Sequence, residues 1–278
     1  MNTFLKSFLR IPSWRRFLVG LVVWYGIVLV LLYFGQREFL YRPTVLSAEQ
    51  FKHRVEKGLH GRGTILPHFD AIVLEPSQKV KSTAILYHGN GGNGLDRVVL
   101  ATDFLNRGYR LVLAEYPGYA ARPGPITEEA LVADAKQLYL EVQQRYPNEP
   151  IAVVGESLGS AMATQVAASS AVPPEALVLI TPFASMADVA HKQLPLYPVS
   201  LLLKDRYESA RHLPGYRGPV RILVADNDEL VGAETGLGLY GIAQSRGPTT
   251  LLRLPGADHN TWVFQLKSTQ WDQLLVRP

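Results

Sequence analysis

The chain of 278 residues contains no cysteine. This absence excludes disulfide bridges, thiolate metal sites and cysteine nucleophiles together, so any nucleophile must be another residue type. The sequence also lacks a His-Glu-x-x-His motif and any two histidines four positions apart, which are common metal-binding patterns. We therefore expect neither a metal nor another cofactor.

Most of the chain has no excess of basic over acidic residues, although the formal net charge of the whole chain is +4. Residues 1–42 carry a net charge of +5, whereas the remaining 236 residues carry −1. Proteins that bind nucleic acid usually present a basic surface on their folded domain. Nucleic acid is therefore not an expected partner.

Charged residues are absent from the 18-residue run Phe17–Phe34, which reads FLVGLVVWYGIVLVLLYF. As a helix this run spans about 27 Å, close to the thickness of the hydrocarbon layer of a bilayer. It ends in Tyr33-Phe34-Gly35-Gln36-Arg37, without the small residues of a signal-peptidase site. The run is thus predicted to be an uncleaved transmembrane anchor, in preference to a cleaved signal peptide or a buried core helix.

The basic residues around this run predict its orientation. Four precede it and two follow closely: Lys6, Arg10, Arg15, Arg16, then Arg37 and Arg42. The positive-inside rule places the more basic end in the cytoplasm. We expect a single-pass membrane protein, with a cytoplasmic stub and anchor at residues 1–36 and a domain at residues 37–278 on the non-cytoplasmic side.

From about residue 65 onward, short apolar runs alternate with amphipathic stretches. This alternation is typical of an α/β protein with a mostly parallel, twisted sheet covered by helices on both faces. A helix capped by Thr127 is expected, with a buried stripe at Leu131, Ala135, Leu138 and Val142. The expected strands are Ala71–Leu74, Thr83–Tyr87, Arg110–Ala114, Ile151–Val154, Ala176–Ile180, Val220–Ala225 and Thr250–Leu254.

The stretch Thr181–Pro219 interrupts this alternation and is rich in leucine, proline and aromatic residues. Ligands bind open α/β sheets outside the carboxyl ends of the strands. We therefore expect a short cap at about residues 181–219 that roofs a site there. In the alternative interpretation, the leucines between Leu196 and Leu203 pack on the sheet as core.

The sequence Gly155-Glu156-Ser157-Leu158-Gly159 follows an expected strand and precedes a helix-compatible stretch. This is the Gly-x-Ser-x-Gly nucleophile elbow in its strand-turn-helix setting, in which glycines permit a tight turn that exposes the serine. A turn of ordinary function could use the same pentapeptide, so further residues are needed. Ser157 is the candidate nucleophile.

Two later strands are followed by the partners that a serine nucleophile needs. Val220–Ala225 leads into Asp226-Asn227-Asp228, and the last expected strand leads into Asp258-His259. The chain order serine, acid, histidine is that of a hydrolase triad. Asp228 is favoured over Asp226 as the acid because it lies beyond the strand end, where a turn can direct its carboxylate at the imidazole of His259. Asp258 is expected to make a turn or solvent contact.

A glycine-rich loop, His88-Gly89-Asn90-Gly91-Gly92-Asn93, follows the strand Thr83–Tyr87. Such loops supply one oxyanion-binding N–H group, which here would come from Asn90, and the residue after the nucleophile, Leu158, would supply the second. The spacing Gly89-x-Gly91-x-x-Gly94, with Glu115 about 20 residues on, also fits a dinucleotide-binding fingerprint. That alternative stays open, but it leaves the serine, aspartate and histidine unexplained.

With these motifs in place, the chain resembles the membrane-anchored, ABHD-like branch of the α/β-hydrolase superfamily over roughly residues 37–270. Ala120 departs from the pattern because many relatives have a second glycine there, and Gly232 stands where a proline is usual. Further motifs that carry the resemblance are Phe39-Leu40-Tyr41-Arg42-Pro43, Glu115-Tyr116-Pro117-Gly118-Tyr119, Thr181-Pro182-Phe183, Asp228–Val231 and Gly256–Asn260.

The resemblance implies a serine hydrolase that cleaves carboxylic esters or thioesters of lipid-like or acylated substrates. Ser157, Asp228 and His259 would form its triad, and Asn90 and Leu158 its oxyanion hole. A serine in the nucleophile position argues against the epoxide hydrolases and haloalkane dehalogenases of this fold, which use aspartate. A dinucleotide-binding protein and a catalytically silent relative that only binds a partner are the alternatives.

Overall fold

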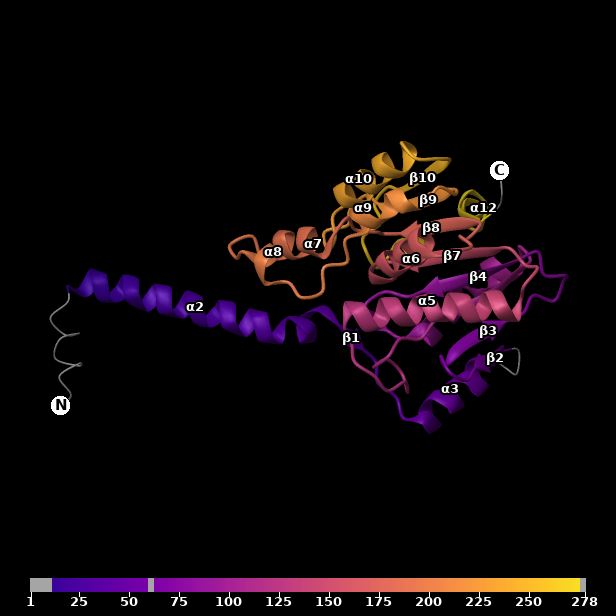
Figure 1. Cartoon of the computed structure of the whole chain (residues 1–278), viewed down its shortest axis with the longest axis horizontal. Coiled ribbons are helices and arrows are strands. Elements are labelled where there is room, and N and C mark those ends of the chain that lie inside the picture. Colours follow the sequence, from indigo (N-terminus) through magenta and orange to yellow (C-terminus); the bar gives the residue numbers. More distant parts are fainter. Residues whose placement is uncertain (1–11, 60–62, 276–278) are drawn as a thin grey trace.

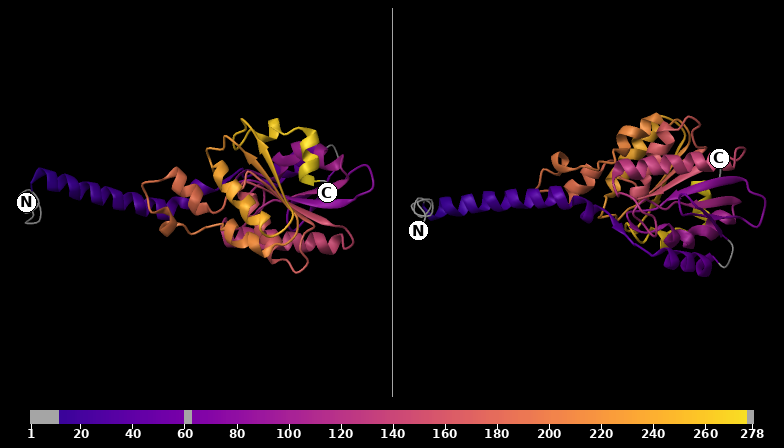
Figure 2. Two further views of the ribbon diagram at one scale, coloured as in Figure 1. Left: turned by 90° about the horizontal axis from the view of Figure 1, so that it is seen from above. Right: turned by 60° about the horizontal axis from the view of Figure 1, so that its bottom comes forward.

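The computed structural model describes residues 12–59 and 63–275. One long helix, α2 (Ser13–Leu40), projects from a domain built around a single large sheet (Figure 1). The same projection is seen from two other directions (Figure 2). Lys6 and Arg10, on which the predicted orientation partly depends, lie outside the described residues.

The large sheet has eight strands in the order β10-β9-β8-β7-β4-β6-β3-β2. β3 runs antiparallel to both of its neighbours, and the other pairs are parallel. Every strand expected from the sequence forms, with ends within two residues of those predicted. The strands are β2 (Gly63–Leu66), β3 (Ala71–Leu74), β4 (Ser82–Tyr87), β6 (Tyr109–Leu113), β7 (Ile151–Glu156), β8 (Ala176–Ile180), β9 (Val220–Ala225) and β10 (Thr249–Leu254).

Helices cover both faces of this sheet, as the alternating pattern predicted. One face carries α5 (Glu128–Arg145), α6 (Leu158–Ser169) and α10 (Ala233–Gln244). The other carries α3 (Ala48–Leu59), η1 (Gly94–Leu100), α4 (Ala101–Leu105), α11 (Trp262–Gln265) and α12 (Ser268–Leu275). These two layers create a core on each side of the sheet.

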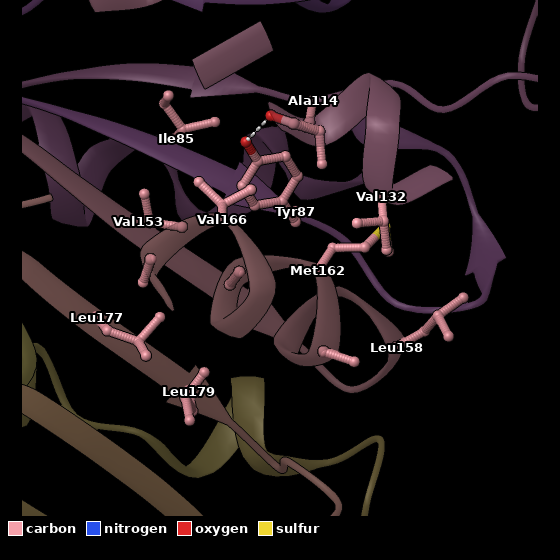
Figure 3. Packing of buried hydrophobic residues seen from close by; sticks show 14 of the residues in the cluster. Ile85, Tyr87, Ala114, Val132, Val153, Leu158, Met162, Val166, Leu177 and Leu179 are labelled. Atoms are coloured by element: carbon pink, nitrogen blue, oxygen red, sulfur yellow. Dashed lines mark hydrogen bonds between the residues drawn. The ribbon is translucent and has the colours of Figure 1, made fainter. Parts of the chain in front are cut away.

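Alternation along each strand divides its side chains between these two cores. Ile85 and Tyr87 of β4 belong to one core, whereas Leu86 between them belongs to the other. Figure 3 shows the first core, which includes Tyr87 of β4 and Met162 of α6. The Tyr87 hydroxyl donates a hydrogen bond of 2.7 Å to the carbonyl oxygen of Ala135. The one polar group of this fully buried side chain therefore has a partner.

Helix α5 illustrates how the sequence specifies these layers. The Thr127 side chain accepts a hydrogen bond from the N–H of Ala130, which caps the helix as predicted. The four apolar residues of the predicted stripe are buried: Leu131, Ala135, Leu138 and Val142. Helix α5 therefore packs one face onto the sheet and leaves the other in solvent.

The region between β8 and β9 divides into two parts. Helix α9 (Ser209–His212) and the turn η2 (Leu213–Gly215) pack against α6, and Leu213 is buried in the core. By contrast, α7 (Met186–Gln193) and α8 (Val199–Leu202) stand beside the end of α2, away from the centre of the sheet (Figure 1). Leu196 and Leu201 are 82% and 84% exposed, so these two leucines do not pack on the sheet as core.

Helix α2 is, within residues 12–59 and 63–275, the helix that is long and apolar enough to cross a membrane. None of its side chains is buried. The helix does not stop at residue 36 but continues to Leu40, where Tyr41 adopts an extended conformation. After α2, β1 (Arg42–Pro43) pairs with β5 (Gly91–Gly92) in the loop after β4, a pairing that no sequence pattern predicted.

Candidate active site

Ser157 occupies the tight turn between β7 and α6. Its φ of +50° and ψ of −115° form a strained conformation for a residue with a side chain. Both flanking glycines are required by close packing, because a Cβ on Gly155 would lie 2.4 Å from the Gly159 carbonyl oxygen and one on Gly159 would lie 2.0 Å from that of Tyr87. The turn thereby holds Ser157 at the carboxyl edge of the sheet and the N-terminal end of α6.

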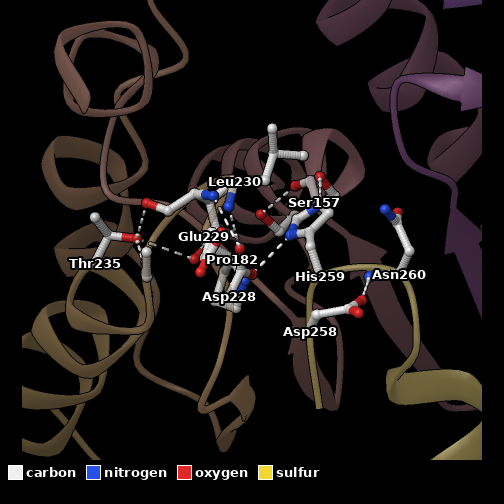
Figure 4. A network of polar contacts seen from close by, with 12 residues as sticks. Ser157, Pro182, Asp228, Glu229, Leu230, Thr235, Asp258, His259 and Asn260 are labelled. Atoms are coloured by element: carbon white, nitrogen blue, oxygen red, sulfur yellow. Dashed lines mark hydrogen bonds and ion pairs between the residues drawn. The ribbon is translucent and has the colours of Figure 1, made fainter. Parts of the chain in front are cut away.

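The structure brings Ser157, His259 and Asp228 together in one hydrogen-bonded row (Figure 4). His259 Nε2 lies 2.8 Å from Ser157 Oγ, and His259 Nδ1 lies 2.7 Å from Asp228 Oδ2. All three residues are less than 9% exposed. They come from the ends of three different strands, which the parallel sheet aligns at one edge.

The other two aspartates lie elsewhere. Asp226 accepts a hydrogen bond of 2.8 Å from Arg253 Nε. Asp258 accepts hydrogen bonds from the N–H groups of Asn260 and Thr261, which closes the turn that carries His259. Of the three candidate carboxylates, Asp228 is the one that contacts the histidine.

Several donors converge on the Asp228 carboxylate. Its Oδ1 accepts hydrogen bonds from the N–H groups of Leu230 and Val231, at 3.0 and 2.9 Å. Burial alone would raise the pKa of the Asp228 carboxyl, but the hydrogen bond and charge of His259 and the N–H groups of Val231 and Gly232 outweigh burial and lower that pKa. Gly232 has a φ of +91°, which proline cannot adopt, so the glycine both permits the turn and supplies an N–H.

Asn90 and Leu158 line the same cavity as Ser157. Leu158 is the first residue of α6, so its N–H has no acceptor within the helix and points out of the helix end. The Asn90 side-chain amide donates to the carbonyl oxygen of Leu40, at 2.8 Å, and the backbone carbonyl oxygen of Asn90 accepts from Tyr119 Oη, at 2.9 Å. The glycine-rich loop is therefore held from both sides.

Glu115 lies in the protein interior. In the dinucleotide-binding interpretation, its carboxylate would accept a hydrogen bond from a ribose hydroxyl. Glu115 is 1% exposed, and its carboxylate contacts His88 Nε2 at 3.3 Å and accepts from the N–H of Gly94 at 2.9 Å. Gly94 opens the 3₁₀ turn η1, whereas the fingerprint needs an α-helix at that point. The Glu115 carboxylate is therefore buried and bonded to the glycine-rich loop, and it is not exposed to a ribose.

A cavity of about 460 Å³ opens onto Ser157. Among the described residues that line it, the polar ones are Gln36, Asn90, Ser157 and Gln193, and the rest are apolar. α7, α8 and their loop contribute Met186, Val189, Ala190, Leu194, Val199, Leu202 and Leu203. The long N-terminal helix α2 contributes Leu32, Gln36, Phe39 and Leu40, which sequence reasoning did not identify because the run around them indicated only a membrane anchor.

Comparison with known proteins agrees with the fold. A family model described as the alpha/beta hydrolase fold matches residues 85–207. An uncharacterised protein of Mycobacterium tuberculosis is 34% identical over 178 residues, which cover 63% of this chain and 62% of that protein. The lysophosphatidylserine lipase ABHD12 of Danio rerio is 31% identical over 193 residues, covering 63% of this chain and 50% of the lipase. The chain thus matches between half and two thirds of the length of these relatives.

Solved structures share the fold at low sequence identity. A Thermus thermophilus protein superimposes with a TM-score of 0.63 and 18% identity, covering 78% of this chain and 99% of that one. An esterase of Pyrococcus furiosus gives a TM-score of 0.61 and 15% identity, covering 74% and 84%. The chain has the α/β-hydrolase fold, and its residues 85–207 match the family model of that fold. Its sequence is similar to that of the ABHD-like branch of the α/β-hydrolase superfamily.

Proposed function

We propose that this protein is a membrane-anchored serine hydrolase that cleaves carboxylic esters or thioesters through an acyl-enzyme. The observation that carries the proposal is the row of hydrogen bonds from Ser157 Oγ through His259 to Asp228. A serine hydroxyl is a weak nucleophile unless a base removes its proton, and the base needs a fixed tautomer. Each of these requirements has a residue in place.

In the proposed mechanism, His259 Nε2 takes the proton from Ser157 Oγ as that oxygen attacks the acyl carbonyl. Asp228 accepts the Nδ1 hydrogen and stabilises the imidazolium that forms. The N–H groups of Asn90 and Leu158 bind the developing oxyanion. His259 then gives its proton to the leaving alcohol or thiol. Water, activated by the same imidazole, releases the acid from Ser157.

The apolar cavity supports an acyl group as the part of the substrate that the protein binds. Burial of each methylene contributes about 0.8 kcal/mol, so kcat/KM should rise with chain length until the cavity is filled. The similarity to a lysophosphatidylserine lipase supports a lipid-like ester, although that relative is about twice as long as the matched segment. Acylated proteins are the second substrate class that fits.

The proposal includes the location of the site. Helix α2 would cross the bilayer through residues 17–34, with the domain that carries Ser157 on the non-cytoplasmic side. This places the mouth of the cavity at the membrane surface, because α2 leads directly into the cavity wall. Amphiphilic esters in the membrane would then reach Ser157 more readily than soluble metabolites.

Labelling with a fluorophosphonate probe tests the proposal, since the probe reacts with activated serines. The full chain should be labelled, and Ser157→Ala should not. Ser169→Ala is the matched control, because Ser169 lies at the far end of the same helix and bonds only to the Gln165 carbonyl oxygen. A chain that is folded but unlabelled would instead be a catalytically silent relative that binds a partner.

A further inference from the structure

The loop that carries α8 runs along the membrane-type helix α2. We define this cap loop as Leu194–Leu203. The Tyr25 hydroxyl of α2 donates a hydrogen bond of 3.0 Å to the Leu196 carbonyl oxygen, and the Tyr25 and Tyr197 rings stack with centroids 5.4 Å apart. Gln36, near the other end of the contact, bonds to the Leu202 carbonyl oxygen and the Lys204 N–H. All three views place this loop beside α2 (Figures 1 and 2).

The position of these contacts along α2 indicates where the cap loop would lie relative to a bilayer. Tyr25 precedes Phe34, the last residue of the charge-free run, by nine positions. On a helix this separation is about 14 Å. The hydrocarbon layer of a bilayer is about 30 Å thick, so half of it is about 15 Å. If α2 spans the bilayer, Leu196 lies within the hydrocarbon of one leaflet.

The composition of the cap loop fits that location. Its ten residues carry no charge, whereas Lys192 and Lys204 flank it. Lys204 Nζ lies over the Tyr33 ring, 4.3 Å from the centroid, at the end of the charge-free run. Beside it, Arg37 forms a bidentate ion pair with Asp205, at 2.7 and 3.0 Å. The charges therefore gather at the level where α2 would leave the membrane.

The exposed leucines of the cap loop, and the protein partners of several of its backbone N–H groups, also fit a location in hydrocarbon. Leu196 and Leu201 would expose large apolar surfaces to water if the loop were in solvent, at 82% and 84% exposure. Backbone groups in hydrocarbon must find partners in the protein, and proline has no N–H to satisfy. Pro195 and Pro198 lie in the loop. Donors to other protein groups include the N–H groups of Leu194, Tyr197, Val199, Leu201, Leu203 and Lys204.

The cavity at Ser157 reaches the same depth. Leu32 of α2 and Leu202 and Leu203 of the cap loop line it together with Ser157. Leu32 lies inside the charge-free run, two positions before Phe34. The cavity therefore extends from the nucleophile to the level of the hydrocarbon, with one wall from α2 and one from the cap loop.

We propose that the cap loop is immersed in the bilayer beside α2, and that the two form a lateral entrance through which an acyl ester dissolved in the leaflet reaches Ser157. The use of this entrance rests on the proposed hydrolase function, whereas immersion of the loop does not. Helix α2 is then part of the substrate-binding site as well as an anchor, and Leu32 is a specificity-determining residue.

Immersion can be measured directly because the chain has no cysteine of its own. Leu201→Cys or Leu196→Cys in the full chain would be labelled with an environment-sensitive fluorophore and placed in phosphatidylcholine vesicles. Lipids brominated on the acyl chain should quench the label as strongly as at Val22→Cys, on the exposed face of α2. Val172→Cys, 64% exposed in the loop between α6 and β8, should not be quenched. Quenching at both loop positions as weak as at Val172 would overturn the proposal.

The entrance is tested by narrowing it from the side of α2. Chain-length selectivity is measured as kcat/KM for a vesicle-borne dodecanoyl ester divided by kcat/KM for an acetyl ester. Leu32→Trp should lower this ratio by on the order of tenfold, which corresponds to the loss of space for about two methylenes. Leu31→Trp is the matched control, because Leu31 is 64% exposed and does not line the cavity. Equal ratios in the two variants would overturn the entrance. Fluorophosphonate labelling of the same samples reports separately on Ser157, so failure of the hydrolase proposal would be recognised independently.

Discussion

The Asn90 side-chain amide donates a hydrogen bond of 2.8 Å to the carbonyl oxygen of Leu40, the last residue of α2. Carbonyl groups in the last turn of a helix have no partner within the helix, so the bond satisfies one of them. It also fixes the residue whose N–H is proposed to bind the oxyanion. The end of α2 and the glycine-rich loop are thereby joined by one contact.

Asn90→Ala should therefore lower kcat by on the order of ten- to a hundredfold while KM changes little, because misplacing an oxyanion donor affects the transition state more than the bound substrate. Steady-state kinetics on a p-nitrophenyl ester would measure the two constants. The control is Asn106→Ala, an exposed asparagine after α4. Equal loss in both variants, or an effect confined to KM, would contradict the role given to Asn90.

Substitution of the two aspartates after β9 by asparagine should have very different effects on kcat/KM. Asp228→Asn should reduce kcat/KM by up to about 10⁴, as the corresponding change does in a chymotrypsin-type triad, because an amide favours the wrong imidazole tautomer. Asp226→Asn loses only the exposed contact with Arg253 and should remain close to wild type. Should Asp226→Asn prove the damaging change, the assignment of the acid is wrong.

Much of the fold and the candidate triad could be predicted because each depends on local pattern. The strands are short apolar runs, and Ser157, Asp228 and His259 each follow such a run at the same edge of the sheet. The edge strand β2 and the two-residue pairing of β1 with β5 have too few residues to give a periodic signal. The contacts of Tyr25 with Leu196 join residues 171 positions apart, and nothing in either segment predicts its partner.

One departure from the family pattern gains a physical reason from the structure. Ala120 has a φ of +45°, a conformation that glycine adopts without strain and alanine does not. The alanine is held there by its N–H bond to the Thr44 carbonyl oxygen and by the Leu46 N–H bond to its own carbonyl oxygen. The glycine that the resemblance leads one to expect would meet this backbone requirement without strain, whereas this chain meets it with tertiary contacts.

Stability should depend on pH through Asp228. The pKa of its carboxyl is lower in the folded protein than in an unfolded chain. Its ionisation therefore stabilises the fold at pH above about 4, and that contribution is lost as pH falls through the lowered pKa. Thermal unfolding of wild type and Asp228→Asn in detergent should differ most near neutral pH and converge on acidification. A difference that grows at low pH would contradict the direction of the shift.

Membrane attachment predicts a simple fractionation result. The full chain should stay with membranes through washes with high salt, because apolar contact of α2 with lipid is insensitive to ionic strength. A truncated chain that starts at Arg37 should be released in soluble form. It would also lose Leu32 and Gln36 from the cavity wall, so its preference for long acyl chains should weaken. Release of the full chain by salt would argue against the anchor.

The covalent intermediate is the most direct test of the central claim. Rapid mixing of the full chain with a p-nitrophenyl ester, followed by acid quench, digestion and mass spectrometry, would locate the acyl group. We expect a burst of p-nitrophenol and an acyl mass increment on Ser157, absent in Ser157→Ala and present in Ser169→Ala. An acyl group found on another residue during turnover would contradict Ser157 as the nucleophile. Turnover with no trapped acyl group, together with full activity of Ser157→Ala, would contradict it as well.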